Sequence, residues 1–166
     1  MSFSPIPKIT APDIYKVTPA FLHDRGVTLL LMDLDNTLSP YSEHSPPEKL
    51  LAWMAKLKAA GIELFIVSNN RSKTRARDYA AACGIPFIRR AGKPSPRSLR
   101  AAMAQMGRHP NETALIGDQV FTDGLAANRA GVLSIVVKPL HMKSVLFYLR
   151  YIIEQPFRLL SKEKIV

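Results

Sequence analysis

Three features of the sequence predict an α/β fold, in which an open parallel sheet is covered by helices on both faces. Short runs such as 27–32 and 62–67 are almost continuously apolar, which is typical of strands buried on both faces. Segments with helical spacing lie between these runs, and glycine closes most of them. Strands that alternate with helices imply right-handed crossovers and therefore parallel strands.

Each element follows from a local pattern. The run 27–32 ends at Asp33 and predicts the first strand of the core; the helix after it is expected to begin with a capping box at Ser45–Glu48 and to stop at Gly61. Apolar runs predict further strands over 62–67, 85–88, 113–117 and 132–137. Helical spacing closed by glycine predicts helices over 71–84, 95–107 and 122–131.

The bulk composition limits the class of protein. The chain has 166 residues, enough for one core, and none of its apolar runs is long enough to predict a membrane span. Lys and Arg number 23 against 13 Asp and Glu, a net charge of +10, so the surface should attract polyanions, with nucleic acid and anionic membrane both candidates. A single cysteine excludes an internal disulfide and a multi-cysteine metal site. No signal peptide is visible, which predicts a cytoplasmic protein.

The chain divides into three expected regions. Residues 1–20 are rich in proline and are expected to be extended, and residues 21–140 hold the strands and helices of the core domain. Residues 141–166 have apolar residues at helical spacing with Lys and Arg around them, which predicts a basic amphipathic helical segment. Its apolar side suits three alternatives: packing on the sheet, contact with an anionic membrane surface, or contact with a partner protein.

Polar residues stand where the predicted strands end. In an open parallel sheet, ligands bind beyond the carboxyl ends of the strands. The side chains expected to converge there are those of Asp33, Asp35, Ser68, Asn69, Lys93, Asp118 and Asp123. Crowded carboxylates repel one another and need a cation, and an all-oxygen cluster favours Mg²⁺. A lysine and a hydroxyl beside such a metal fit a bound phosphate, and a carboxylate can act as a nucleophile toward phosphorus.

The motifs "DLDNT", "VSNN", "GKPS" and "GDQVFTD" resemble, in their order and strand-end positions, those of the haloacid dehalogenase superfamily over roughly residues 20–140. The resemblance implies a Rossmann-like fold and a phosphatase that forms an aspartyl-phosphate. It makes Asp33 the nucleophile and Asp35 the general acid and base, while Thr37 steadies the turn that orients Asp35. Phosphate would be bound by Ser68, Asn69 and Lys93, and Mg²⁺ by Asp33, Asp118, Asp123 and the backbone carbonyl of Asp35.

The spacing of the motifs leaves no room for the cap domain that many members of the superfamily carry. A capless site resembles members that act on large substrates, or that use a second copy of the chain as a lid. The finer similarity is to subfamily IIIA, which includes the phosphatidylglycerophosphate phosphatases and the YqeG-type bacterial proteins. It implies conversion of phosphatidylglycerophosphate to phosphatidylglycerol in phospholipid biosynthesis, at the inner face of a membrane.

Two other functions compete with this one. The same chemistry could act on a soluble sugar, nucleotide or nucleic-acid-end phosphate. Alternatively, the chain could be a non-enzymatic basic module that binds RNA or a protein, although a module without activity has no need for Asp33, Asp35, Lys93 and Asp118 together. No DNA partner is expected under the preferred interpretation, whose partners are an anionic phospholipid and the membrane surface.

Overall fold

A parallel sheet forms the centre of the protein. The structure, a computed structural model, describes residues 4–142 and 144–166. All of the strand pairs in it are parallel, and the strands lie in the order β4-β3-β2-β5-β6-β1-β7. The strands are β1 (Ile9–Ala11), β2 (Leu29–Met32), β3 (Glu63–Val67), β4 (Phe87–Ile88), β5 (Thr113–Gly117), β6 (Leu133–Val137) and β7 (Glu163–Lys164). The predicted parallel α/β fold is confirmed.

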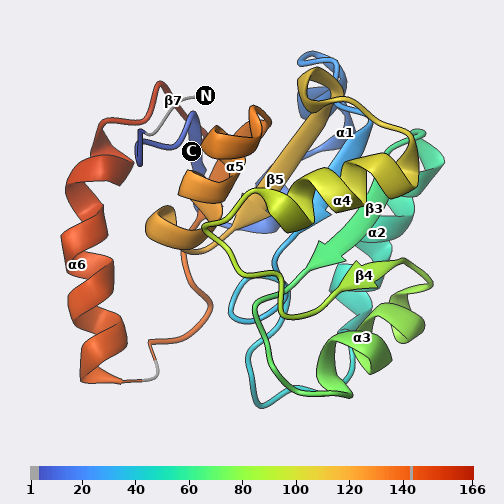
Figure 1. Ribbon diagram of the computed structural model, residues 1–166, viewed down its shortest axis with the longest axis horizontal. Coiled ribbons are helices and arrows are strands. Elements are labelled where there is room, and N and C mark those ends of the chain that lie inside the picture. Colours follow the sequence, from blue (N-terminus) through green and yellow to red (C-terminus); the bar gives the residue numbers. More distant parts are fainter. Residues whose placement is uncertain (1–3, 143) are drawn as a thin grey trace.

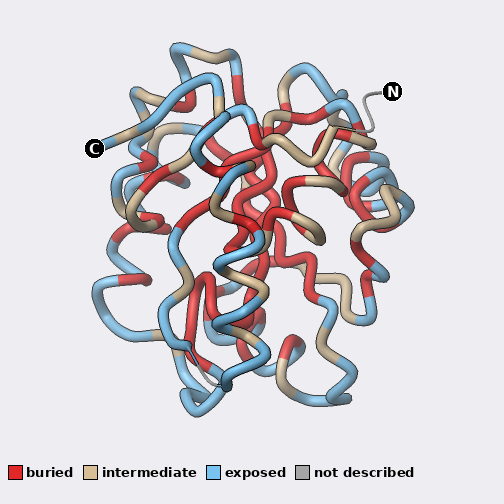
Figure 2. The backbone as a smooth tube through the Cα atoms, turned by 90° about the vertical axis from the view of Figure 1, so that its left-hand side faces the viewer, coloured by how far each residue is buried: buried red, intermediate tan, exposed pale blue. Residues whose placement is uncertain are grey.

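Helices cover both faces of this sheet (Figure 1). One face packs against α1 (Pro19–His23), α2 (Glu48–Ala59) and α3 (Arg75–Cys83), and the other packs against α4 (Arg97–Met106) and α5 (Leu125–Ala130). Successive residues of a strand point to opposite faces, so Leu30 lies in the first core and Leu31 in the second. This explains the continuous apolar run that predicted β2. The buried segments gather in the middle of the molecule (Figure 2).

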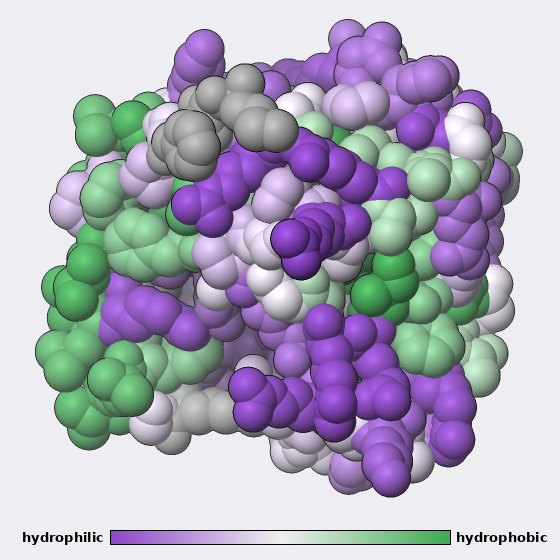
Figure 3. Space-filling model, viewed as in Figure 1, coloured by the Kyte–Doolittle hydropathy of each residue, from purple (hydrophilic) through white to green (hydrophobic). Residues whose placement is uncertain are grey.

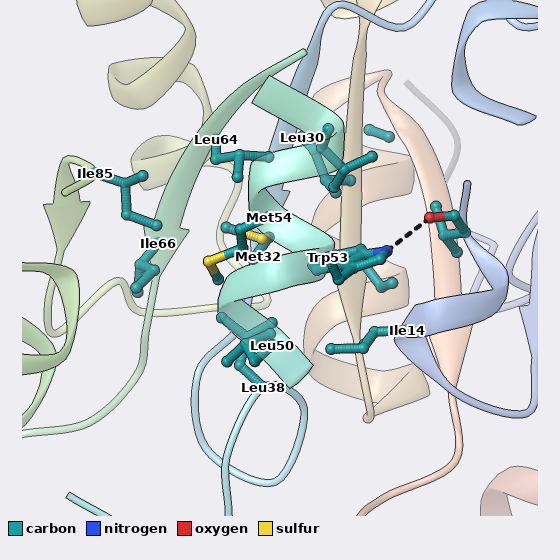
Figure 4. Packing of buried hydrophobic residues seen from close by; sticks show 14 of the residues in the cluster. Ile14, Leu30, Met32, Leu38, Leu50, Trp53, Met54, Leu64, Ile66 and Ile85 are labelled. Atoms are coloured by element: carbon teal, nitrogen blue, oxygen red, sulfur yellow. Dashed lines mark hydrogen bonds between the residues drawn. The ribbon is translucent and has the colours of Figure 1, made fainter. Parts of the chain in front are cut away.

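Apolar burial and one side-chain hydrogen bond fix the position of α2. Leu50, Met54 and Leu57 are buried at helical spacing against the sheet. Trp53 is also buried, and its indole Nε1–H donates to the carbonyl of Val17 at 2.9 Å (Figure 4). A buried indole N–H needs such a partner, so this bond ties α2 to the segment that precedes α1.

Two regions differ in detail from the sequence pattern. The capping box predicted at Ser45–Glu48 is wrong: α2 begins at Glu48 with Pro47 in the N-cap position, and no side chain caps it. The observed N-cap residue is a proline, which has no side-chain oxygen to accept from the first turn and no backbone N–H for a reciprocal bond. The N-terminal segment was expected to be extended throughout. In the structure its strand β1 pairs with β6, and a 3₁₀ turn (Ile14–Lys16) then leads to α1.

The end of the chain adds α6 (Val145–Leu159) and β7, and β7 pairs with β1. The helix stands at one side of the molecule (Figure 1). No helix in the described part of the chain is long and apolar enough to cross a membrane. The residues between β2 and β3 form a loop and α2, and those between β3 and β4 form a loop and α3. Neither connection contains an additional domain, so the carboxyl ends of these strands carry no cap.

Candidate active site

Three carboxylates meet at the carboxyl ends of the central strands. Asp33 follows β2, Asp118 follows β5, and Asp123 lies in the single π-helical turn η3 (Val120–Gly124) that leads into α5. One oxygen of each carboxylate lies within 4.8 Å of the others, and all of these residues are buried. Neighbouring strands β2 and β5 pair in register along their length, which is why their first following residues are adjacent in space.

Lys93 supplies a positive charge to this cluster. Its Nζ atom donates to Asp33 Oδ1 and to Asp123 Oδ1, each at 2.6 Å, and the side chain is almost completely buried. Asn69 holds the lysine backbone from both sides: its amide nitrogen donates to the Lys93 carbonyl at 3.0 Å, and its amide oxygen accepts from the Lys93 N–H at 2.9 Å. Asn69 therefore positions Lys93 in this structure.

The turn after β2 brings a hydroxyl between two carboxylates. Thr37 Oγ1 lies 3.2 Å from Asp33 Oδ2 and 3.2 Å from Asp118 Oδ1, and it is buried. Asn36 has a positive φ of 68°, a conformation that asparagine tolerates better than most residues. Its side chain exchanges two hydrogen bonds with the backbone of His141. The turn is thus held by Thr37 at the carboxylates and by Asn36 at the loop around His141.

The carboxylate cluster fits a metal ion. Asp118 Oδ2 is buried and has no hydrogen-bond partner in the described residues. A buried charged oxygen without a partner is costly, and a cation between the carboxylates would remove this cost. Because Asp33, Asp118 and Asp123 offer only oxygen atoms, a hard divalent cation suits them best. This acidic triad can therefore hold a metal ion.

Burial shifts the acid–base equilibria of these groups. Loss of solvent raises the pKa of Asp33 to about 7, against the opposing charge of Lys93. Burial also raises the pKa of Asp118 well above its usual value, and Asp33 and Asp123 add to this effect. For Lys93, burial alone would lower the pKa, but the carboxylates of Asp123 and Asp33 outweigh it and hold the pKa above its usual range. Lys93 therefore stays protonated and positively charged beside the carboxylates.

These shifts predict how the metal-free protein responds to pH. The pKa values of Asp33 and Asp118 lie above the value of 3.8 for a free side chain, so the folded state binds more protons than the unfolded state. The free energy of unfolding should therefore fall as pH rises above about 4, for Asp33 up to its pKa of about 7, by up to about 1.4 kcal/mol per pH unit for each group that titrates.

Thermal unfolding in EDTA, compared with that of Asp118→Asn, isolates this effect. Asparagine cannot ionise, so the variant should gain stability relative to the wild type as pH rises. Added Mg²⁺ should stabilise the wild type more at pH 8 than at pH 5, because a metal binds ionised carboxylates. A difference between the two proteins that is independent of pH would contradict the raised pKa of Asp118.

Gly117 allows Asp123 to approach the end of β5. A Cβ atom at this position would lie 2.3 Å from Asp123 Cγ, which is closer than atoms can pack. We predict that Gly117→Ala displaces the Asp123 carboxylate. If the acidic triad holds the metal, phosphatase activity measured with Mg²⁺ should fall by at least about tenfold, as loss of metal-site geometry commonly does. Gly124→Ala is the control, since its Cβ would meet Val136 Cγ2 at 3.4 Å, an ordinary contact. Equal activities in the two variants would contradict this role of Gly117.

Asp35 is held by two residues that the sequence motifs do not mark for this purpose. Arg75 Nε donates to Asp35 Oδ1 at 2.6 Å, and Asn70 Nδ2 donates to Asp35 Oδ2 at 2.7 Å. Arg75 also donates to the carbonyls of Pro40 and Glu43, so one guanidinium joins α3, the acid and the loop after β2. Asn70 could have been suspected, because it adjoins Asn69 in "VSNN"; the role of Arg75 depends on how α3 packs.

We predict that Arg75→Gln slows cleavage of esters with poor leaving groups. If Asp35 is the general acid, its orientation matters most when the leaving alkoxide needs a proton. The turnover number for an alkyl phosphate should therefore fall by about tenfold or more, whereas that for p-nitrophenyl phosphate should change less. Arg77→Gln is the matched control, since Arg77 pairs with Asp78 on the exposed surface. Equal losses for both esters would argue against a role through Asp35.

A cavity of about 360 Å³ opens beside these groups. Among the residues that line it are Asp33, Asp35, Asn69, Lys93 and Asp123. The structure therefore brings these predicted site residues together, with Thr37 and Asp118 directly behind them. Ser68 is placed differently: it is fully buried, its hydroxyl accepts from the N–H of Asn70 at 3.1 Å, and it is not part of the cavity lining. Its contact with phosphate stays a prediction.

Comparisons with known proteins agree with this geometry. The family of hydrolases described as haloacid dehalogenase-like hydrolase matches residues 9–131. The chain is 35% identical to "Probable phosphatase YqeG" of Bacillus subtilis, over 81% of this chain and 77% of that protein. It is 32% identical to "Phosphatidylglycerophosphate phosphatase 1, chloroplastic" of Chlamydomonas reinhardtii, over 81% of this chain but only 53% of that protein.

Among solved structures, the 3-deoxy-D-manno-octulosonate 8-phosphate phosphatase of Moraxella catarrhalis, which was crystallised with magnesium and phosphate ions, has a similar fold. The TM-score is 0.58 at 21% identity, and the similarity covers 86% of this chain and 78% of that one. The family match spans most of the strands of the sheet, and the alignment with YqeG covers most of this chain and most of YqeG. This protein therefore belongs to the haloacid dehalogenase-like hydrolases and is a phosphatase that is similar in sequence to YqeG and, more distantly, to phosphatidylglycerophosphate phosphatases.

Proposed function

We propose that the protein is an Mg²⁺-dependent phosphatase that hydrolyses phosphatidylglycerophosphate to phosphatidylglycerol through an aspartyl-phosphate. The observation that carries the proposal is the contact of one buried lysine with two buried carboxylates, Asp33 and Asp123, beside the unpartnered oxygen of Asp118. Such a site offers a nucleophile, a fixed cation and a metal position within one cavity. Phosphoryl transfer depends mainly on positioning and on charge stabilisation of this kind.

The proposed reaction has two steps, which Asp33 and Asp35 share. In the first, a carboxylate oxygen of Asp33 attacks phosphorus, the bond from phosphorus to the glycerol oxygen breaks, and Asp35 donates a proton to that oxygen. In the second, Asp35 accepts a proton from a water molecule whose oxygen attacks phosphorus, and the bond to Asp33 breaks to release phosphate. Lys93 lies against the nucleophile at 2.6 Å and favours its ionised form, which offsets the burial that raises its pKa.

The metal would be held by Asp33, Asp118 and Asp123. When bound, Mg²⁺ supplies positive charge to the transferring phosphoryl group. Thr37 fixes the relative orientation of two of these ligands through its contacts with Asp33 and Asp118. Asp35 is outside this cluster, because its carboxylate faces Arg75 and Asn70; a contribution of its backbone carbonyl to the metal belongs to the proposal.

A lipid substrate suits the surroundings of the cavity. Phosphatidylglycerophosphate has a phosphate diester in addition to the monoester that is cleaved. Arg71 lines the cavity and also a neighbouring hollow that includes Arg90, and both arginines are exposed. They could bind the diester while the monoester enters between Asp33 and Lys93. The absence of a cap leaves space for the acyl chains outside the cavity, and the phosphatidylglycerophosphate phosphatase named among the relatives supports this choice.

The test is phosphate release from phosphatidylglycerophosphate in detergent micelles, with Mg²⁺ and with EDTA. We expect release that requires Mg²⁺ and that soluble sugar or nucleotide phosphates inhibit poorly. If soluble esters are cleaved in preference to the lipid, the substrate assignment is wrong and the phosphatase chemistry stands. If no ester is cleaved under any metal condition, the interpretation as a binding module replaces both.

A further inference from the structure

The helix α6 carries its apolar side chains on the outside. Six of them recur at helical spacing and are largely exposed; this α6 outer stripe consists of Val145, Leu146, Leu149, Ile152, Ile153 and Leu159, with exposed fractions between 47% and 78%. Hydrophobic side chains gather at the corresponding edge of the molecule (Figure 3, same view as Figure 1). A contiguous exposed apolar surface of this kind marks an interaction site.

The opposite side of α6 explains why the stripe faces outward. Glu154 and Arg158 are buried against the body of the protein. Glu154 Oε1 accepts from the N–H of Phe121 at 3.3 Å, and Arg158 donates to the carbonyl of Val137 at 2.9 Å and to that of Asp118. Phe157 packs edge-on against Phe121 at 5.2 Å. Rolling the helix to bury the stripe would break these polar contacts, so its outward display is built into the fold.

The stripe is linked to the catalytic cavity at two points. Through Arg158, α6 is bonded to the backbone of Asp118, one of the three carboxylates at the metal position. The loop before α6 is bonded to the turn after β2, through Asn36 and His141, and this loop exposes the further apolar side chains of Leu140 and Met142. A surface that binds the stripe would therefore be joined through these bonds to the acidic triad and to the turn after β2, which carry the groups of the site.

The stripe could be covered by a second copy of the chain or by an anionic membrane surface, and the charge of the chain favours the membrane. A net charge of +10 makes two copies repel each other and attracts an anionic surface. Lys162 and Lys164 follow α6 directly and are exposed, and basic residues near an anionic bilayer strengthen binding. Because the stripe covers one side of a single helix, it suits a helix that lies in the interface with its apolar side among the lipids.

We propose that the α6 outer stripe docks the protein on an anionic bilayer and holds the cavity at the lipid headgroups. The proposal rests on the proposed function for its substrate, since a lipid phosphatase must meet its substrate at such a surface. The contact itself rests on the exposure, polarity and charge described above. It predicts that catalysis on lipid in a bilayer depends on α6, whereas the chemistry of the site does not.

The experiment is flotation of the whole protein with vesicles of phosphatidylcholine alone, or of phosphatidylcholine and phosphatidylglycerol in equal amounts. We expect binding to the anionic vesicles only, and weaker binding as salt is raised. The double variant Leu149→Glu with Ile153→Glu should bind at least about tenfold more weakly, because charged residues do not enter the acyl region. The matched control is Leu51→Glu with Ala55→Glu, at exposed positions of α2 with the same spacing and charge change.

Three results would overturn the docking proposal. In the first, the stripe variant binds vesicles as well as the wild type. In the second, the control binds as weakly as the stripe variant, which would mean that net charge alone explains vesicle binding. The wild type could instead ignore vesicles and form a dimer that the stripe variant dissociates, making a second copy the occupant. Micelle hydrolysis separates these from the proposed function: hydrolysis without vesicle binding removes only the docking proposal, and vesicle binding without hydrolysis removes only the substrate.

Discussion

Replacing Asp33 with asparagine is expected to abolish phosphate release while leaving the protein folded. In the proposed reaction Asp33 is the nucleophile. An amide cannot attack phosphorus, and removal of a catalytic nucleophile commonly lowers the turnover number by about ten-thousandfold or more. The change is nearly isosteric, and burial raises the pKa of the Asp33 carboxyl to about 7, so a neutral side chain suits the site in the absence of metal. Melting temperature in EDTA at pH 8 should therefore stay the same or rise.

The measurement is single-turnover phosphate release with Mg²⁺, together with thermal unfolding of the same preparations. Asp78→Asn is the control, because Asp78 is an exposed aspartate that pairs with Arg77 on α3. It should retain full activity. A variant at Asp33 that still releases phosphate at more than a few per cent of the wild-type rate would assign the nucleophile to another residue, and one that loses its melting transition would make the kinetic result uninformative about chemistry.

Replacing Lys93 with methionine is expected to impair both activity and stability. Methionine keeps the apolar stem but leaves Asp33 and Asp123 without the cation that each contacts at 2.6 Å. Removing one member of a buried ion pair costs about 3–5 kcal/mol, and loss of a fixed charge at the reacting phosphate lowers turnover by about a hundred- to a thousandfold. The loss of stability should be smaller at pH 5 than at pH 8, because protonated carboxylates need no cation.

Mg²⁺ gives the second readout for Lys93. A divalent cation between the carboxylates should restore part of the lost stability, so added Mg²⁺ should raise the melting temperature of Lys93→Met more than that of the wild type. Lys56→Met on α2, where the lysine is exposed, is the control and should match the wild type in all three measurements. If the loss of stability at Lys93 is the same at both pH values, the lysine stabilises the fold by packing rather than by charge.

Much of the fold was predictable because its signals are local. The strands β2, β3, β5 and β6 are short, mostly apolar runs, and a strand buried on both faces requires this pattern wherever it sits. The helix after the first strand was predictable from the spacing of Leu50, Met54 and Leu57, although its start was not, since the N-cap is Pro47 rather than the expected Ser45. The strand-end acids were predictable because parallel strands deliver their following residues to one edge.

Other features depend on contacts between distant segments. The sequence predicted Asp35 at the site, but its two partners come from the loop after β3 and from α3, and only packing brings Arg75 to within 2.6 Å of it. The same is true of Gly117, whose missing side chain matters because Asp123 folds back against it. The local sequence around Arg75 or Gly117 does not reveal these roles, because each role arises from a residue that is distant along the chain.

The sequence by itself determined the class of fold, the edge of the sheet that bears the site and the acids and lysine that occupy it. The tertiary structure alone decided how α6 lies. The apolar spacing of this helix suits burial on the sheet as well as exposure, and the sequence could not choose between them. The choice was made by Glu154 and Arg158, which find buried backbone partners in the body of the protein, because burying charged groups requires such partners while apolar groups can remain outside.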